Sequence, residues 1–133
     1  MDLTTSIDVS ASALRAQSLR MRVIAENLAN QDSTAATPGG DPYRRRVVTF
    51  QPDVKGDGTH VRVRSVVADP SDFTRVHQPG HPAADAAGYV LRPNVNGLVE
   101  STDMKAAQRA YEANIGAVEA AKSMTLRTID LLK

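Results

Sequence analysis

Apolar residues recur at seven-residue steps in the first part of the chain, at Ile7, Leu14, Met21 and Leu28. Residues spaced this way lie on one face of an α-helix, so the pattern predicts an amphipathic helix from Leu3 to Ala29. No glycine or proline interrupts the chain before Pro38. A helix of roughly 25 residues extends about 37 Å at 1.5 Å per residue.

A second helical pattern fills the last third of the chain. Its seven-residue steps fall on Met104, Tyr111, Val118, Thr125 and Leu132, with Ala107, Ile115, Ala121 and Ile129 beside them. The pattern predicts a helix that begins at Asn96 or Ser101 and ends at Leu132. Asn114 lies on the line of Ala107 and Ala121, where it either fixes the helix register from a buried position or faces solvent.

Seven-residue apolar patterns are typical of helices that wind around one another in coiled coils. The segment between the two helices is too short to cover both along their length, so the helices must pair with each other, with other chains, or with both. We expect an α+β chain whose long N- and C-terminal helices form a coiled-coil layer, with a small β-rich segment in the middle of the chain. The expected parts are 1–34 for the N-terminal helix, 35–93 for the loop and β-rich middle, and 94–133 for the C-terminal helix.

The middle of the chain reads as short strands between turns. Tyr43 to Gln51 favours extended structure, and His60 to Val67 alternates apolar and charged residues. These two segments predict a hairpin whose turn begins near Asp53 and contains Gly56 and Gly58. The proline-rich stretch that follows is expected to be mostly irregular up to a short strand at Tyr89 to Arg92.

The segment from Gly88 to Glu100 concentrates turn-forming residues where the last strand meets the C-terminal helix. Pro93 lacks a backbone N–H and therefore ends the strand. Asn94 and Asn96 favour a turn, and Asn96 is the first choice for the residue that caps the helix, with Ser101 as the second. The segment is predicted to be the joint between the β-rich middle and the helix.

The composition predicts that the chain has only a small hydrophobic core within itself. Aromatic residues make up only 4% of it, tryptophan and cysteine are absent, and the formal net charge is +1. Disulfides and thiolate metal sites are therefore excluded, and there is no strong attraction to nucleic acid. The acidic N-terminal segment lacks the basic and apolar regions of a cleaved secretory signal, so we expect export, if any, by another route.

No arrangement of side chains predicts catalysis or a cofactor. His77 and His81 have metal-ligand spacing, but prolines and a glycine around them exclude a helix, and His60 is distant in sequence. Arg44 to Arg46 are expected to form a solvated or ion-pairing surface rather than a nucleic-acid site. We therefore predict no catalytic residue, no metal, no cofactor, no nucleic-acid partner and no small-molecule substrate.

Both ends of the chain resemble bacterial flagellar basal-body rod proteins, and in particular the proximal rod proteins. The C-terminal resemblance lies in "GYV", "PNVN", "RAYEAN" and "AAKSM", and the N-terminal one in "SASALRAQSLRMRVIAENLANQDST", which includes Asn27 and Asn30. "PYRRRVVTF" and "DAAGYV" are also similar. Gly97 and Leu98 depart from the family pattern, in which a proline and a more apolar or acidic residue are expected, and Ser101–Asp103 replaces a more hydrophobic segment.

The resemblance implies a structural subunit of the flagellar rod, the axial shaft that transmits torque across the periplasm. It implies export by the flagellar type III apparatus without a cleaved signal, and terminal helices that become ordered on assembly. Partners would be other copies, other rod proteins, the inner-membrane ring and the rod-base adapter protein. We predict the assembly surface at Ile7, Leu14, Met21, Leu28, Met104, Tyr111, Val118 and Ile129.

Two other functions remain open at this point. A monomeric binding module, whose two helices pair only with each other, would show fully formed and cooperatively melting helices in the isolated chain. A small hydrolase or metal protein would depend on its three histidines. An assembly subunit would instead show weak helicity when isolated and would keep its function after substitution of all three histidines.

Overall fold

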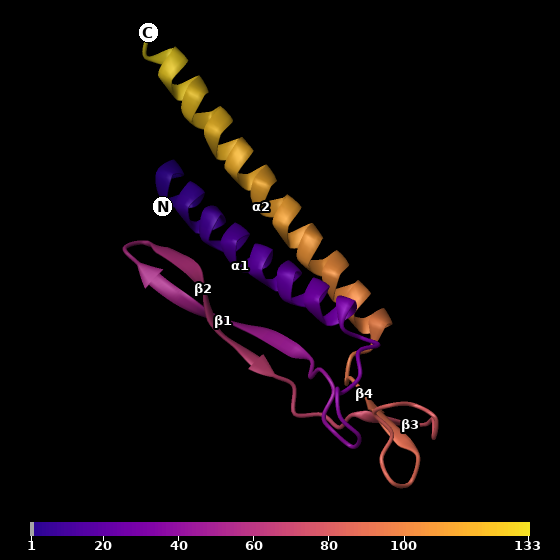
Figure 1. Ribbon diagram of the computed structural model, residues 1–133. Helices are drawn as coiled ribbons and strands as arrows, with labels where there is room; N and C mark the ends of the chain where they lie inside the picture. Colours follow the sequence, from indigo (N-terminus) through magenta and orange to yellow (C-terminus); the bar gives the residue numbers. More distant parts are fainter. Residues whose placement is uncertain (1) are drawn as a thin grey trace. The chain divides into compact units, whose positions relative to one another are not determined.

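The computed structural model describes residues 2–133, and it contains two long helices and four strands (Figure 1). α1 spans Leu3–Ala29 and α2 spans Gly97–Leu131. The predicted α+β class and both predicted helices are confirmed. Within the described chain, neither helix is long and apolar enough to cross a membrane.

Side-chain and backbone caps fix both ends of α1. At its start, the backbone N–H of Thr5 donates to Asp2 Oδ1 at 2.7 Å. This hydrogen bond lowers the pKa of the Asp2 carboxyl. At its end, Asn30 donates to the carbonyl of Glu26 from its backbone N–H at 3.1 Å and from Nδ2 at 2.8 Å. The Asn30 side chain thus adds a second hydrogen bond to a carbonyl in the last turn of the helix.

β1 (Arg46–Lys55) and β2 (Gly58–Ala68) pair in a two-stranded sheet, which confirms the predicted hairpin. Its bounds differ from the prediction, because Asp53 and the next two residues continue β1 and leave a connection of only Gly56 and Asp57. Gly56 has a φ of 61° and Asp57 does not have a positive φ. A glycine in the first position is typical of the tight II′ turn, whose twist matches that of the paired strands.

β3 (Thr74–His77) and β4 (Tyr89–Arg92) form a second, antiparallel pair in which Val76 faces Val90. The strand β4 was predicted, and the stretch before it is mostly irregular as expected, but β3 within that stretch was not predicted. Four residues in a proline-rich stretch carry little strand signal of their own. They become a strand because β4 returns beside them, and such a long-range pairing leaves no local pattern.

The chain divides into two compact units. Unit 1 contains α1 up to Met21, residues Val48–Ser65 and residues Lys105–Lys133. Unit 2 contains Arg22–Val47 and Val66–Met104. Each helix contributes its two ends to different units.

Unit 1 packs through small residues. Its buried apolar side chains are alanines, at positions 16, 107 and 121. A Cβ added to Gly58 of the hairpin would lie 2.7 Å from Thr5 Cγ2, so glycine allows the hairpin to approach α1 closely. The buried hydroxyl of Ser12 on α1 accepts a hydrogen bond from the backbone N–H of Val61 at 3.0 Å. α1 thereby lies between the hairpin and α2 in this unit (Figure 1).

Unit 2 has a core of larger apolar side chains and of buried polar ones. Val23, Ile24, Ala83 and Val90 are buried, and Val90 is fully enclosed. Asn27 and Glu100 are buried among them. Buried polar groups are costly unless they are hydrogen-bonded, so their partners show what holds this unit together.

Candidate functional site

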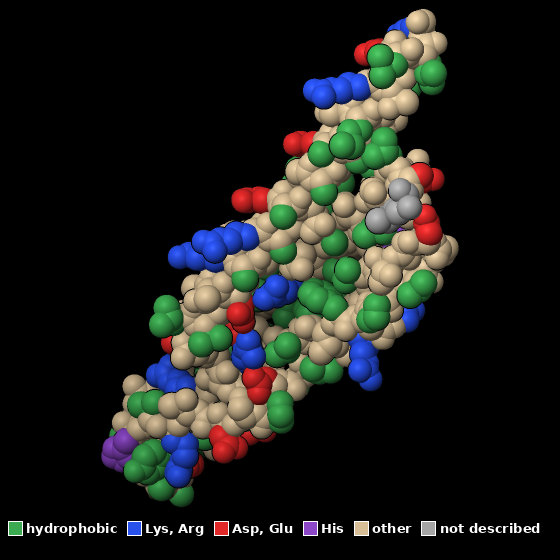
Figure 2. Space-filling view, turned by 180° about the vertical axis from the view of Figure 1, so that it is seen from behind, with side chains coloured by type: hydrophobic (Ala, Val, Ile, Leu, Met, Phe, Trp, Pro, Cys, Tyr) green, Lys and Arg blue, Asp and Glu red, His purple; other side chains and the backbone are tan. Residues whose placement is uncertain are grey.

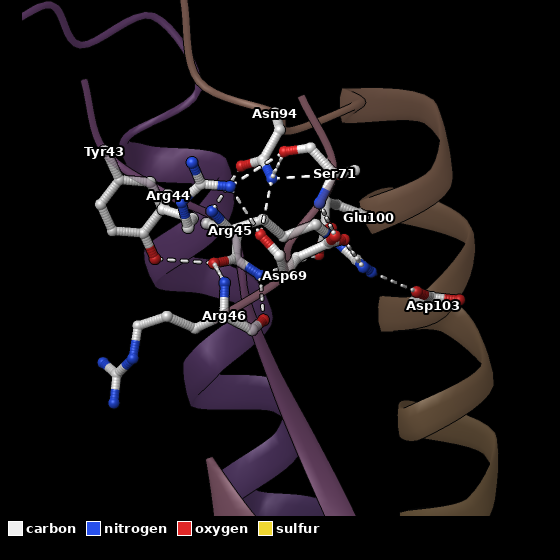
Figure 3. A network of polar contacts seen from close by, with 10 residues as sticks. Tyr43, Arg44, Arg45, Arg46, Asp69, Ser71, Asn94, Glu100 and Asp103 are labelled. Atoms are coloured by element: carbon white, nitrogen blue, oxygen red, sulfur yellow. Dashed lines mark hydrogen bonds and ion pairs between the residues drawn. The ribbon is translucent and has the colours of Figure 1, made fainter. Parts of the chain in front are cut away.

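A network of polar side chains joins the segments of unit 2 (Figure 3). It connects the end of α1, the residues leading into β1, the segment after β2 and the start of α2. We call this set the junction network, and it consists of Asn27, Tyr43, Arg44, Arg45, Arg46, Asp69, Ser71, Asn94, Glu100 and Asp103.

Glu100 is the centre of the junction network and has no solvent-exposed surface. Its Oε1 accepts a hydrogen bond from Arg45 Nε, and its Oε2 accepts one from Asn27 Nδ2 at 3.3 Å. Arg45 also pairs with Asp69 at 3.1 Å and with Asp103 at 3.4 Å. A buried carboxylate persists only when it is paired and hydrogen-bonded in this way.

The same contacts set the ionisation of Arg45. Burial disfavours its charged form, but the hydrogen bonds to Glu100 and Asp69 outweigh burial and raise the pKa of Arg45. The pKa of the Asp69 carboxyl is lowered, chiefly because the backbone N–H of Ser71 donates to it and also because Arg45 is its partner. Both residues are therefore held in their charged forms.

Asn27 binds the start of β1 as a neighbouring strand would. Its Oδ1 accepts from the backbone N–H of Arg46 at 3.0 Å, and its Nδ2 donates to the Arg46 carbonyl at 2.8 Å. The Tyr43 hydroxyl donates to the same Oδ1 at 2.6 Å. Burial raises the pKa of Tyr43, which keeps this hydroxyl protonated and able to donate.

Asn94 performs a similar task from the segment before α2. Its Oδ1 accepts from the backbone N–H of Arg45 at 2.7 Å, and its Nδ2 donates to the carbonyls of Asp69 and Ser71, each at 3.1 Å. Arg44 donates to the same two carbonyls and stacks on the Phe73 ring at 4.1 Å. The side chain of Asn94 therefore fixes two segments that are distant in sequence.

The predicted joint before α2 has the expected order of residues. β4 ends at Arg92, and Pro93 follows it in a buried position. Asn96 Oδ1 accepts hydrogen bonds from the backbone N–H groups of Leu98 at 3.0 Å and Val99 at 3.3 Å. Asn96 is thus the cap, as its sequence position predicted, and Ser101 lies inside the helix.

The predicted assembly residues are mostly half-buried within the chain. This applies to Ile7, Leu14, Met21, Leu28, Met104, Tyr111 and Val118, whereas Ile129 is half exposed. Asn114 is also half-buried and donates to the Ala110 carbonyl of its own helix at 2.7 Å. The line of these residues on α2 includes the buried Ala107 and Ala121, so it faces the interior of unit 1. Their contact with neighbouring subunits stays a prediction.

A second surface was only partly included in the prediction. Large apolar side chains are uncovered over the last turns of α2 (Figure 2), and we call them the apolar end of α2. They are Met124, Leu126, Ile129, Leu131 and Leu132, with exposed fractions of 57%, 53%, 48%, 85% and 83%. These five side chains point to different sides of the helix. A seven-residue pattern describes only one side, so the predicted assembly surface included only Ile129 of the five.

The pairing of Arg45 with Glu100 was missed by sequence reasoning. Arg44 to Arg46 were expected to form a surface, yet Arg45 is the member of the three that reaches the buried carboxylate. The alternation of side chains along an extended segment carried this signal, because Arg45 must face away from its two neighbours. The prediction of an ion-pairing surface is confirmed in part, since Arg45 and Arg46 form ion pairs whereas Arg44 donates to backbone carbonyls.

The histidines of unit 2 take part in local contacts. The rings of His77 and Tyr89 meet edge to face at 5.0 Å, and His81 Nδ1 accepts from the backbone N–H of Ala83 at 3.0 Å. Among residues 2–133, no three His, Asp or Glu side chains are grouped so as to hold a metal ion. The side chains of the junction network, in contrast, bond backbone groups and so hold backbone segments in place.

Comparison with protein families finds two matches along the chain. Residues 7–36 match the family described as flagella basal body rod protein, and residues 86–131 match the family described as flagellar basal body rod FlgEFG protein C-terminal. Asn27 falls in the first matched range, and Asn94 and Glu100 fall in the second. The matched ranges thus carry the side chains at the centre of the junction network.

Comparison with individual proteins finds relatives over nearly the whole length. The chain is 43% identical to the flagellar basal-body rod protein FlgC of Agrobacterium fabrum over 133 residues, covering 98% of this chain and 96% of that one. It is 44% identical to FlgC of Salmonella typhimurium, covering 98% of each chain. It is 40% identical to FlgC of Bacillus subtilis over 147 residues, covering 96% of this chain and 97% of that one.

Proposed function

We infer the role of this chain from its membership of the FlgC family of flagellar basal-body rod proteins, to which it belongs. It is a structural subunit of the proximal rod in the flagellar basal body, and the expected resemblance is confirmed. We assign it the finer role of polymerising through its terminal helices into an axial shaft that transmits torque.

The observation that supports helix-mediated assembly is the apolar end of α2. Large apolar side chains that lie close together on a protein surface mark a site of contact with another protein. Here five such side chains face solvent, with Leu131 and Leu132 more than four-fifths exposed. Their exposure favours a chain that is completed by neighbours over a monomeric module whose helices pair only with each other.

The junction network supports the mechanical part of the role. It fixes the start of α2 to the end of α1 and to the β segments through a buried ion pair and several amide hydrogen bonds. Such multiply bonded contacts resist rotation of one segment against another. We propose that, within unit 2, the network holds the end of α1 and the start of α2 to the β segments while the rod turns under load.

The proposed partners follow from the role. They are other copies of the chain, other rod proteins, the inner-membrane ring and the adapter protein at the base of the rod. The proposed place is the periplasmic part of the rod, reached through the flagellar export apparatus without a cleaved signal. Within it, the predicted lines of residues on α1 and α2 would form the coiled-coil layer nearest the axis.

Deletion of the gene, followed by imaging of purified basal bodies, tests the role. We expect cells that do not swim and basal bodies that lack a complete rod, with both defects corrected by the wild-type gene. A complete rod and normal swimming in the deletion strain would contradict the role. Simultaneous substitution of His60, His77 and His81 by alanine is the matched control, because it should leave the rod and swimming intact.

A further inference from the structure

An apolar groove runs between the two helices of unit 1. It has a volume of about 390 Å³ and is lined by Leu3, Ser6 and Val9 of α1 and by Ala117, Ala120 and Ala121 of α2. The serine and alanine side chains are short, so the helices leave space between them. A groove of this kind accepts large apolar side chains from another helix.

The apolar end of α2 provides side chains of the required kind. The groove reaches Met124 on α2, and the helix then continues to Leu131. In Figure 1 this last part of α2 runs on past the start of α1. The end of α2 therefore cannot use α1 of its own chain as a partner over its final turns.

The charges around the two surfaces are complementary. Residues 2–14 contain Asp2 and Asp8 and no lysine or arginine, for a formal charge of −2. Residues 122–133 contain three cations and the single carboxylate of Asp130, for a formal charge of +2. Asp8 and Arg127 are both exposed. Opposite charges beside an apolar contact select its partner and orientation.

We propose that the apolar end of α2 from one copy docks in the groove between α1 and α2 of a second copy, with Arg127 beside Asp8. The groove ends at Met124, so the groove and the part of the docking segment beyond Met124 are different surfaces of the same chain. Each copy that is bound therefore still offers a free surface. Contacts of this type extend from subunit to subunit rather than closing a dimer. This inference rests on the proposed function and specifies the contact through which copies join.

Cysteine crosslinking in purified basal bodies tests the docking, because the native chain has no cysteine. Ser6→Cys and Leu131→Cys are introduced together and oxidised, since a disulfide forms only when the two Cα atoms come within about 7 Å. We expect bands at the dimer and higher multiples of the 14.3 kDa chain. Each single variant, and the pair of Thr4→Cys with Leu131→Cys, should give no such series, because Thr4 does not line the groove.

Charge reversal provides an independent measurement on the same crosslink. Asp8→Arg or Arg127→Asp should each lower the crosslinked fraction by about threefold, the range of a single exposed ion pair. The two reversals together should restore the crosslink. A merely structural role of either residue would not produce this restoration.

Complete rods and normal swimming without the crosslinked series would overturn the docking and leave the proposed function standing. A crosslink from Leu131→Cys to a different rod protein that carries the matching cysteine, and none to a second copy, would also overturn it. If the first pair of cysteines prevents rod formation, Ser10→Cys with Leu132→Cys makes the same comparison at the next positions of the two surfaces. A complete rod after deletion of the gene would instead contradict the proposed function itself.

Discussion

The two ends of α2 are stabilised in opposite ways. Its first turns carry Glu100, which is fully buried and bonded to Arg45 and Asn27 of the same chain. Its last turns carry five large apolar side chains that the chain leaves in solvent. One end is thus completed within the chain, whereas the other is the end for which we propose a neighbour. The contrast teaches that one helix can have a fully bonded start and an uncovered end.

Loss of the buried carboxylate should have the largest effect on the isolated chain. Glu100→Ala leaves the Arg45 guanidinium without its buried partner, and breaking a buried ion pair costs about 3 kcal/mol. We expect the free energy of unfolding, measured with urea and tyrosine fluorescence, to fall by about this amount. Asp103→Asn is the control, because Asp103 lies at the exposed edge of the network and its loss should cost less than about 1 kcal/mol. Equal effects of the two substitutions would contradict the central place of Glu100.

A methyl group at the contact between hairpin and α1 should have the next largest effect. Gly58→Ala places a Cβ 2.7 Å from Thr5 Cγ2 and 3.1 Å from Val9 Cγ2, so either these side chains or the hairpin must shift. We expect a loss of about 2 kcal/mol in the free energy of unfolding. Gly116→Ala is the matched control, since no atom lies within 4 Å of the added Cβ. Alanine there should stabilise the helix by about 0.5–1 kcal/mol, and destabilisation by both changes would argue against the steric explanation.

Removal of the cap of α2 should have a moderate effect. Asn96→Ala removes the acceptor of the Leu98 and Val99 N–H groups and should cost about 1 kcal/mol in the free energy of unfolding. Asn96→Asp keeps an acceptor at the same place and should cost much less. The same urea titrations measure both variants. A loss from Asn96→Ala no greater than that from Asn96→Asp would show that the cap adds nothing to the helix.

Acid should weaken the junction network by a smaller amount. The pKa of Asp69 is lower in the folded chain than its usual value of 3.8. Its contribution to stability is therefore fully present above that value and is lost as the pH falls through the lower folded pKa. We expect the urea midpoint to drop between pH 5 and about pH 3, and Asp69→Asn to reduce that drop. An unchanged drop in Asp69→Asn would assign the acid sensitivity to other carboxylates.

Substitution at the apolar end of α2 should have the smallest effect on the isolated chain. Leu131 is 85% exposed, so Leu131→Asp should change the free energy of unfolding by less than about 0.5 kcal/mol. The same change should prevent rod completion, because it places a charge where neighbouring helices pack. Swimming assays and basal-body imaging measure the second effect. Normal rods in this variant would contradict the proposal that the apolar end of α2 is needed for assembly.

The elements that the sequence predicted are those with a local pattern. The seven-residue steps through Ile7 and Met104 predicted both helices, Asn96 predicted the start of α2, and the alternation after His60 predicted the hairpin. The strand at Thr74–His77 was missed because its partner lies across the loop of residues 78–88. Arg45 and Glu100 were missed for the same reason, since each looks like a solvated charge until the fold brings them together.

The apolar end of α2 was predicted only in part. Its residues are visible in the sequence, but a helix that covers its own core and a helix that awaits a partner have similar patterns. Only the exposed fractions distinguish them, because Ala121 is buried whereas Leu131 and Leu132 are not. The exposure on which the proposed contact with neighbouring copies rests is therefore visible in the structure and not in the sequence alone.

The labelling rate of one engineered thiol tests the contrast between the two ends of α2 most directly. In Leu131→Cys, the thiol should react with a maleimide rapidly in the isolated chain, because this position is exposed. In purified basal bodies the rate should be at least about tenfold lower, because neighbouring helices then cover the position. Equal rates in the isolated chain and in the assembled rod would contradict the account, since the apolar end of α2 would then remain uncovered in the structure it is proposed to build.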